Sequence, residues 1–467
     1  MKKFHLPVFN IIDKMLKKMT LLYLLLALFV GCGNGNNPTN NPGGETAFYG
    51  EPFQKIPSLN EIIMYEANER VFASQNSFNA ITARLDEIRS LGVNVLWLMP
   101  VTEQGKEKAI GSPYCVKNYL KTEPEYGTLD DLRNLVKEAH SRDMAVIIDW
   151  VANHTSWDNN WLSNNPSWYT RDANGNVGPP AGTGWNDVVD LDYSNQNMRA
   201  AMIDAMKYWV REANVDGFRC DAADFVPDDF WKEAIYKLRN MQEGRKLILL
   251  AEGTNVKNME AGFDLDYGWN FGDILVNTYN DKSLISDLFR SNQTEFETIP
   301  GGKQKLRFST NHDKASENSP ISVYNSQQGA LSAFVIAGTM GGVPLIYSSQ
   351  EVGYPDKLSF FSYHYVNWGA NQDIYNAYKK VMSIRSNSSA LQKGSIKTYN
   401  DRDIVLFSRS DGTQSIYVAV NVRNETKTLN VPADWIGVSC KNLLNNSNVT
   451  LPETIEMQPY QYLIFSK

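Results

Sequence analysis

Short apolar runs recur through the middle of the chain, and each is followed by a polar cluster and then by an amphipathic stretch. Runs that are apolar at nearly every position are typical of strands covered on both faces, as in a parallel sheet. Eight such strands are predicted, at 62–65, 93–99, 145–148, 218–220, 247–250, 263–267, 306–308 and 343–347. Helical periodicity is clearest at 78–91, 129–141, 198–213, 229–241, 327–339 and 374–386. Eight alternating units predict an α/β fold whose strands close into a TIM (β/α)8 barrel.

Two segments depart from this alternation. Residues 155–195 are rich in Trp, Asn, Gly and Pro and lack helical periodicity, which predicts a short excursion after the third strand. Although this excursion is short for a domain, it is long for a loop, and long loops inside a compact domain are usually functional. After residue 393, short strands separated by turns are predicted at 395–399, 404–408, 415–422, 427–431 and 460–465. We therefore assign 46–393 to the barrel and 394–467 to a C-terminal antiparallel β domain, a β-sandwich.

The N-terminal segment has the pattern of an export signal rather than of a folded element. Lysines at 14, 17 and 18 precede an apolar run from Leu21 to Val30, which is short for a transmembrane helix. The sequence Phe-Val-Gly-Cys that ends at Cys32 resembles a bacterial lipobox, in which Cys32 is acylated and becomes the mature N-terminus. The alternatives are an ordinary signal peptide with an incidental cysteine or a short membrane anchor.

We therefore expect residues 1–32 to be a lipoprotein signal peptide with its lipobox, and 33–45 to be a flexible tether rich in Gly, Asn and Pro. The protein is then exported and lipid-anchored to the bacterial outer membrane, on either its periplasmic or its cell-surface face. This anchor is the one membrane contact that we expect.

Composition and charge narrow the possible partners. The formal net charge is −7 and no basic stripe is present, so nucleic acid is not an expected partner. Apart from Cys32, the cysteines at 115, 220 and 440 form neither a disulfide framework nor a metal-binding spacing. No nucleotide-binding glycine loop or redox motif is apparent, and we expect a monomer without an organic cofactor.

Four polar clusters directly follow predicted strands, where a barrel presents its active-site loops. They are Asp149 to His154, Gly217 to Ala223, Leu249 to Gly253 and Phe308 to Asp313. Hydrolysis of a glycosidic bond needs one carboxylic acid to protonate the leaving oxygen and a second carboxylate to attack the sugar or to activate water. The spacing along the chain leaves retention and inversion open, because that outcome depends on the separation of the two groups in space.

Two neighbours of these acids are interpreted from strand alternation. Arg219 stands two residues before Asp221, so both point to the same strand face and the arginine can keep this carboxylate ionised. Cys220 points to the other face and is interpreted as a packed thiol. Asp149 is assigned a structural role near its strand end. Taken singly, each acid could equally be a solvated strand-end residue or an ion-pair partner.

The four clusters, in this order, resemble the four conserved regions of the α-amylase family of glycoside hydrolases, family 13, and the resemblance covers 62–467. It implies that Asp221 is the nucleophile, that Glu252 is the general acid and then the general base, and that Asp313 stabilises the transition state. The implied reaction is retaining hydrolysis of α-1,4-glucosidic bonds in starch-type glucans or maltooligosaccharides by double displacement.

The same resemblance implies the residues that hold the sugar. His154 and His312 hydrogen-bond the unit on the non-reducing side of the cut, and Arg219 orients Asp221. Tyr114 matches the stacking tyrosine of that subsite, because its spacing to Tyr126-Gly127-Thr128 is the family's. An aromatic ring suits the apolar face of a pyranose.

A calcium ion is the possible cofactor that the resemblance implies. The positions that match its ligands are Asn153 and Asp190, both oxygen donors suited to a hard cation. The chain departs from the family after the nucleophile, where Asp224-Phe225 replaces a common Lys-His pair. This departure weakens the case for calcium and alters the leaving-group side of the cleft.

Two other functions remain open. A 4-α-glucanotransferase would use the same covalent intermediate with a sugar hydroxyl in place of water. A non-catalytic glycan-binding lipoprotein would keep the barrel without turnover, although such relatives typically lose one or more of the three acids, all of which are present here.

Overall fold

The computed structural model describes residues 47–467, of which Phe48–Lys467 form one compact unit. The predicted signal peptide, Cys32 and the tether at 33–45 lie outside the described residues. Within the described part of the chain, no helix is both long and apolar enough to span a bilayer.

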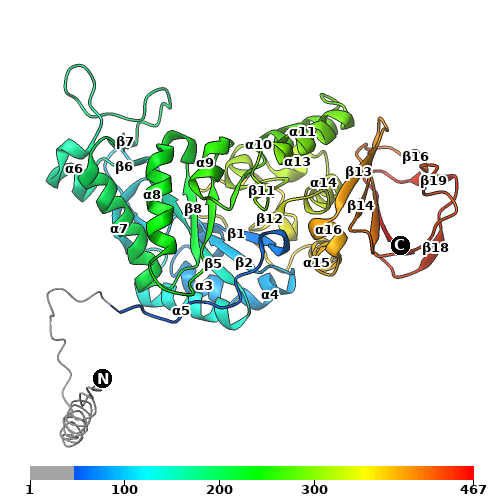
Figure 1. Cartoon of the computed structure of the whole chain (residues 1–467), viewed down its shortest axis with the longest axis horizontal. Helices are drawn as coiled ribbons and strands as arrows, with labels where there is room; N and C mark the ends of the chain where they lie inside the picture. Colours follow the sequence, from blue (N-terminus) through cyan, green and yellow to red (C-terminus); the bar gives the residue numbers. More distant parts are fainter. Residues whose placement is uncertain (1–46) are drawn as a thin grey trace, which may run out of the picture. The chain divides into compact units, whose positions relative to one another are not determined.

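Eight parallel strands form a closed barrel, as the apolar runs predicted (Figure 1). They are β1 (Met64–Ala67), β2 (Val95–Leu98), β5 (Ala145–Val151), β8 (Gly217–Asp221), β9 (Ile248–Ala251), β10 (Leu265–Tyr267), β11 (Gln304–Arg307) and β12 (Val343–Tyr347). Each strand pairs with the next in chain order, and β12 closes the barrel against β1. The (β/α)8 barrel is therefore confirmed.

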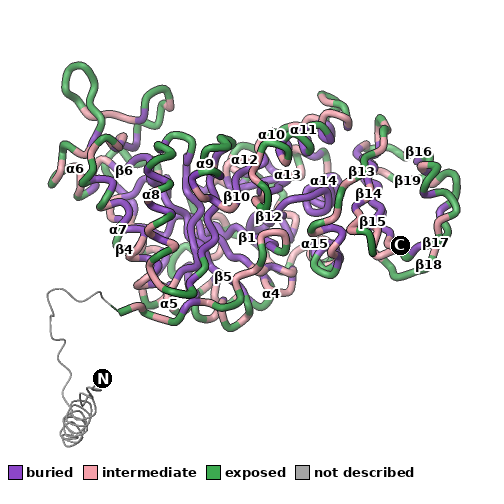
Figure 2. The backbone as a smooth tube through the Cα atoms, viewed as in Figure 1, coloured by how far each residue is buried: buried purple, intermediate pink, exposed green. Residues whose placement is uncertain are grey.

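The strands read as continuous apolar runs because both of their faces are buried. Alternate residues such as Met64, Trp97 and Leu250 form one buried cluster, while their neighbours Tyr65 and Leu96 belong to the larger core that includes the helices. This division is that of a barrel filled by side chains and covered by a ring of helices. Figure 2 shows the buried strands at the centre of the molecule.

The helices that surround the barrel match the predicted periodic segments closely. They include α5 (Leu129–Ser141), α7 (Gln196–Glu212), α8 (Asp228–Arg239), α14 (Gln327–Thr339) and α15 (Gln372–Ser386). Two more, α10 (Trp269–Tyr279) and α11 (Ile285–Glu297), lie between β10 and β11, where no helix was predicted.

One predicted helix is divided. The segment 78–91 forms α3 (Ser77–Thr82) and α4 (Leu85–Ser90), because Arg84 leaves helical geometry at φ −108° and ψ 5°. The guanidinium of Arg84 lies 4.5 Å from the ring centroid of Trp368, a cation–π contact with a residue far away in sequence. Because this contact joins residues far apart in sequence, helical periodicity alone does not predict the break at Arg84.

Two small antiparallel pairs lie outside the barrel sheet. In the excursion, β6 (His154–Ser156) pairs with β7 (Val188–Asp190), and the short helix α6 (Asn160–Asn164) lies between them. Before it, β3 (Thr102–Gln104) pairs with β4 (Val116–Thr122), a hairpin that the apolar pattern did not predict. Tyr114 lies in the loop of this hairpin.

The C-terminal strands form the predicted antiparallel β domain. A six-stranded sheet contains, in order, β13 (Ser395–Tyr399), β14 (Ile404–Ser410), β15 (Ser415–Asn421), β20 (Tyr462–Ser466), β17 (Ser439–Asn442) and β18 (Asn448–Thr450). A second pair consists of β16 (Lys427–Asn430) and β19 (Thr454–Met457). A separate apolar cluster that includes Leu406, Leu429, Trp435 and Met457 joins these two sheets.

Candidate active site

A cleft of about 370 Å³ brings together the side chains predicted from the four polar clusters. Its lining includes all three predicted catalytic acids and three of the predicted sugar-binding residues: Tyr114, His154, Asp221, Glu252, His312 and Asp313. Apart from Tyr114, which lies in the loop between β3 and β4, these residues lie at or soon after the carboxyl ends of barrel strands, where barrels of this kind place their active sites.

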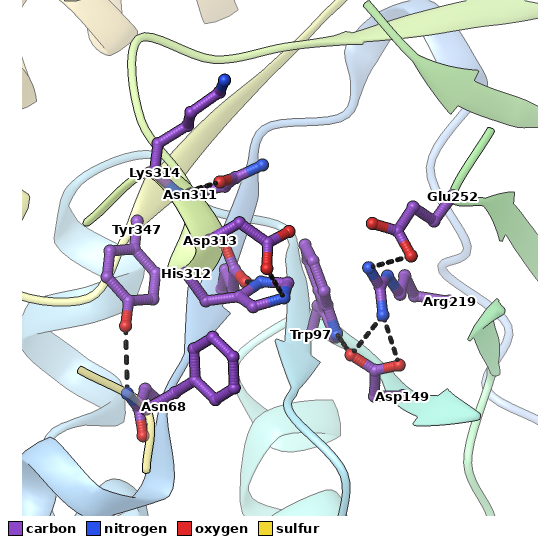
Figure 3. Close-up of polar contacts among 12 residues, drawn as sticks. Asn68, Trp97, Asp149, Arg219, Glu252, Asn311, His312, Asp313, Lys314 and Tyr347 are labelled. Carbon is purple, nitrogen blue, oxygen red and sulfur yellow. Dashed lines mark hydrogen bonds and ion pairs between the residues drawn. The ribbon is translucent and has the colours of Figure 1, made fainter. Parts of the chain in front are cut away.

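Arg219, buried in β8, contacts Asp149 and Glu252 (Figure 3) and also Asp221. Its Nη1 donates to Asp221 Oδ1 at 2.9 Å and to the Asp149 oxygens at 2.8 and 3.1 Å. Its Nη2 forms an ion pair with Glu252 Oε2 at 2.9 Å. Because Arg219 and Asp221 are two residues apart in one strand, they share a face, as predicted. One guanidinium thus contacts three carboxyl groups.

Glu252 follows β9 and is held by the main chain as well as by Arg219. Its Oε2 accepts a hydrogen bond from the backbone N of Ala222 at 2.8 Å. Ala222 has φ +44°, a left-handed conformation that alanine rarely adopts and that directs its N–H to Glu252. The loop after Asp221 therefore positions Glu252.

Glu252 and Asp221 have different pKa values, and burial raises both. It raises the pKa of Glu252 to about 7 and that of Asp221 to about 6, while the charge of Arg219 opposes both shifts. Glu252 therefore keeps its proton to a higher pH than Asp221 does. Two carboxyl groups whose environments separate their pKa values are suited to different roles, one as a proton donor and one as an ionised group.

His312 belongs to a second chain of contacts that begins in β1. Its Nδ1 pairs with the buried carboxylate of Glu66, and its Nε2 lies 2.9 Å from Tyr114 Oη and 3.4 Å from Asp313 Oδ1. Burial alone would lower the pKa of His312, but the carboxylates of Asp313 and Glu66 outweigh burial and raise it to about 9. His312 is therefore a cation at neutral pH.

Tyr114 and His154 form part of the cleft wall. The hydroxyl of Tyr114 donates to Asp149 Oδ2 at 3.1 Å, and its ring stacks on His312 with centroids 5.5 Å apart. Burial lowers the pKa of His154 to about 4, so this imidazole is neutral. The ring of Trp185 lies 5.5 Å from that of His154.

Three residues that the sequence analysis did not place at the site support it. Trp97 donates to Asp149 at 3.2 Å, Tyr267 accepts from Arg219 Nε at 3.1 Å, and Glu66 holds His312. Glu66 is an acid inside an otherwise apolar strand, and this feature of the sequence could have identified it as a site residue. Asp149, to which a structural role was assigned, binds both Arg219 and Tyr114.

The two predicted calcium ligands lie close together. Asn153 directly precedes His154, which is paired with Asp190 across β6 and β7. The amide of Asn153 lies 3.3 Å from His154 Nδ1. Among residues 47–467, however, no group of three or more His, Cys, Asp or Glu is arranged to hold a metal ion. Calcium takes six to eight oxygen ligands, so these side chains would supply only a minority of a site.

Asp224-Phe225, the departure from the family pattern, has two separate effects. Asp224 accepts hydrogen bonds from Thr254 N at 3.0 Å and from Asn258 Nδ2 at 2.6 Å, which ties the β8 loop to the β9 loop. Phe225 lines the cleft, is 57% exposed, and has its ring 5.8 Å from that of Trp185. An acid therefore stands where the family commonly has a lysine, and an apolar ring stands where it commonly has a histidine.

Comparison with known proteins gives one consistent result. The family model described as the catalytic domain of alpha amylase matches residues 69–174 and 183–364, more than half of the chain. Alpha-amylase 3 of Dictyoglomus thermophilum is 27% identical over 460 residues, which cover 82% of this chain and 88% of that protein.

Solved structures agree with this match. A maltogenic alpha-amylase, AmyB, from Thermotoga neapolitana superposes with a TM-score of 0.79 at 27% identity, covering 88% of this chain and 99% of that one. An alpha-amylase from Lactobacillus plantarum gives a TM-score of 0.78 at 26% identity, with the same coverage. The chain therefore belongs to the α-amylase family and is a glycoside hydrolase of the α-amylase type.

Proposed function

We propose that this enzyme hydrolyses α-1,4-glucosidic bonds in starch-type glucans or maltooligosaccharides with retention, by double displacement. The supporting observation is that Arg219 binds Asp221 and Glu252 through different nitrogens, in one cleft. The charge of Arg219 favours the ionised form of both carboxyl groups, but burial raises the pKa of Glu252 to about 7 and that of Asp221 to about 6, so Glu252 is the more readily protonated of the two. The amylase relatives support an α-glucan as the substrate class.

In the first step, an Asp221 oxygen attacks the anomeric carbon while Glu252 donates its proton to the glycosidic oxygen. The bond between the anomeric carbon and that oxygen breaks, and a covalent glycosyl–Asp221 ester forms. Arg219 favours the ionised form of Asp221, because an opposite charge within hydrogen-bonding distance stabilises it. A retaining enzyme of this kind has its two carboxyl groups roughly 5–5.5 Å apart.

In the second step, Glu252, now ionised, takes a proton from water as the water attacks the anomeric carbon. The ester bond to Asp221 breaks, and Glu252 is protonated again for the next cycle. Asp313, whose side chain is 39% exposed in the cleft, faces the sugar and stabilises the positive charge that develops on the ring.

The sugar on the non-reducing side is held by three residues in this proposal. Neutral His154 and cationic His312 hydrogen-bond its hydroxyls, and the ring of Tyr114 packs against its apolar face. The hydroxyl of Tyr114 is already engaged by Asp149 and His312, so its ring is fixed before substrate arrives.

The test is digestion of soluble starch, pullulan and maltoheptaose by a protein that starts near residue 46. We expect Asp221→Asn and Glu252→Gln to lose at least about 10³-fold in kcat with unchanged folding, because each removes a group that acts in the transition state. Asp204→Asn, at an exposed acid of α7, is the matched control. Absence of turnover on all three substrates would contradict the proposal and favour a glycan-binding role.

A 4-α-glucanotransferase is the second candidate, and Phe225 is the observation that favours it. Phe225 and Trp185 form an apolar wall at the cleft, on which an acceptor sugar can stack in place of water. Chromatography of maltoheptaose digests separates the two reactions. Products longer than the donor indicate transfer, and Phe225→Ala should then shift the products towards hydrolysis.

We also propose a structural calcium ion at Asn153 and Asp190, with main-chain oxygens and water completing its shell. No catalytic step depends on it. Chelation should lower the Tm, with restoration by added Ca²⁺ but not by Mg²⁺, which prefers a smaller octahedral site. An unchanged Tm after chelation would exclude the ion.

Export and lipid anchoring are proposed on the sequence alone, through Cys32, with the protein a monomer on the outer membrane. Mass spectrometry of the membrane-extracted protein should show a diacylated N-terminal cysteine. Cys32→Ala should release the protein from the membrane fraction, whereas Cys440→Ala, at a buried structural thiol, should not.

A further inference from the structure

A second cavity, of about 810 Å³, lies between α11 and the strands β13 and β14. It reaches Gln304, the first residue of β11, and Gly341 and Gly342, which precede β12. These positions mark the amino-terminal end of the barrel strands. The cavity is therefore at the opposite end of the barrel from the catalytic cleft.

One wall of this cavity is a buried cation without a compensating anion. Arg409 in β14 is only 6% exposed. Its Nη1 donates to the carbonyl oxygen of Met340, and its Nε is buried without a hydrogen-bond partner among residues 47–467. Burial alone lowers the pKa of Arg409 to about 10, with no contribution from a neighbouring carboxylate.

The backbone accommodates this guanidinium closely. A Cβ atom at Gly341 would lie 2.7 Å from Arg409 Nη1, and Gly341 has φ +147°. Any larger residue there would displace the arginine. The position of Arg409 is therefore set by the barrel as well as by its own strand.

The surroundings add positive rather than negative charge. Arg385 is also buried and hydrogen-bonds only main-chain carbonyl oxygens in the described chain. Burial and the charge of Arg409 lower the pKa of Arg385 to about 9. At the rim, Lys393 is exposed, while the one lining acid, Glu297, already accepts a hydrogen bond from Gln293 at 2.7 Å.

We infer that this cavity binds a small oxyanion of the phosphate or carboxylate class, with Arg409 as its charged partner and Lys393 at the rim. A buried charge is costly unless it is paired, and this arginine has no pair within the described chain. The planar guanidinium is suited to oxyanions, because its donors match two oxygens at once.

The test uses inorganic phosphate as the probe, with chloride at matched ionic strength as the reference. Equilibrium dialysis should show one saturable site on the wild-type protein. At about ten times the Kd, phosphate should raise the Tm by about 1–3 °C, because it binds only the folded state. Arg409→Gln should abolish both effects, and Lys393→Gln should weaken binding several-fold.

Arg402→Gln, at an exposed arginine that does not line the cavity, is the matched control and should bind phosphate as the wild type does. Should Arg409→Gln fail to fold, Lys393→Glu replaces it, since a carboxylate at the rim should repel the anion. Equal effects of phosphate and chloride on the wild type, or unchanged phosphate binding in these variants, would overturn the inference.

Discussion

At the scale of the residue, the contacts of His312 decide the charge that it presents to the sugar. Glu66→Gln keeps the size of the side chain but removes one of the two carboxylates that raise the pKa of His312. The carboxylate of Asp313 alone then opposes burial, so the pKa of His312 should fall and a smaller fraction of the imidazole should be charged at pH 7. We expect kcat/KM to fall about tenfold, the effect of losing one charge-assisted hydrogen bond, and the NMR titration of His312 to move to lower pH.

Glu69→Gln is the matched control for this prediction. Glu69 is buried beside the same strand, where burial raises its pKa well above its ordinary value, and it forms no hydrogen bond or ion pair with His312 in the described chain. Its replacement by glutamine should leave both kcat/KM and the titration of His312 unchanged. An equal loss in both variants would indicate damage to packing rather than to the charge of His312.

Also at the residue scale, the two acids predict a bell-shaped dependence of kcat/KM on pH. Activity requires Asp221 ionised, so it should fall as pH drops through about 6, and it requires Glu252 protonated, so it should fall as pH rises through about 7. The leaving group of a maltosyl fluoride needs no proton. With this substrate, kcat/KM should therefore no longer fall at alkaline pH. Retention of the alkaline fall would argue against Glu252 as the acid.

At the scale of the element, α5 is held by a capping box. The Thr128 side chain accepts from Asp131 N at 3.2 Å, and Asp131 Oδ2 accepts from Thr128 N at 2.8 Å. Thr128→Ala leaves a helical N–H without its partner and should destabilise the protein by about 1 kcal/mol, seen as a lower Tm with unchanged kcat. Ser141→Ala, at the other end of the helix, should change stability by less than about 0.5 kcal/mol.

At the scale of the whole molecule, Arg423 connects the β domain to the barrel. Its Nη1 donates to Thr278 O at 2.6 Å in α10, and its Nε donates to Asp403 Oδ1 at 2.8 Å. Arg423→Ala should cost about 2 kcal/mol, because it leaves partly buried partners unpaired. Calorimetry should show a lower Tm, or two separated transitions, with kcat unchanged at 25 °C. Arg402→Ala, at an exposed neighbour, should behave as the wild type does.

The sequence alone determined the barrel and the clusters that form the cleft. Strands buried on both faces are apolar throughout, so each of the eight could be recognised locally. Parallel strands then bring their carboxyl ends to one face, which places Asp221, Glu252 and Asp313 together without any knowledge of contacts.

Only the tertiary structure decided which charged and polar side chains pair with one another. The ion pair of Arg219 with Glu252, the contact of Glu66 with His312, and the hairpin that carries Tyr114 join residues far apart in sequence. The sequence likewise does not show that Arg409 is buried without an ion-pair partner in the described chain, since an arginine in a strand is ordinarily expected to be exposed or paired. Local patterns report which face is buried, whereas pKa values and pairing depend on what the fold brings to that face.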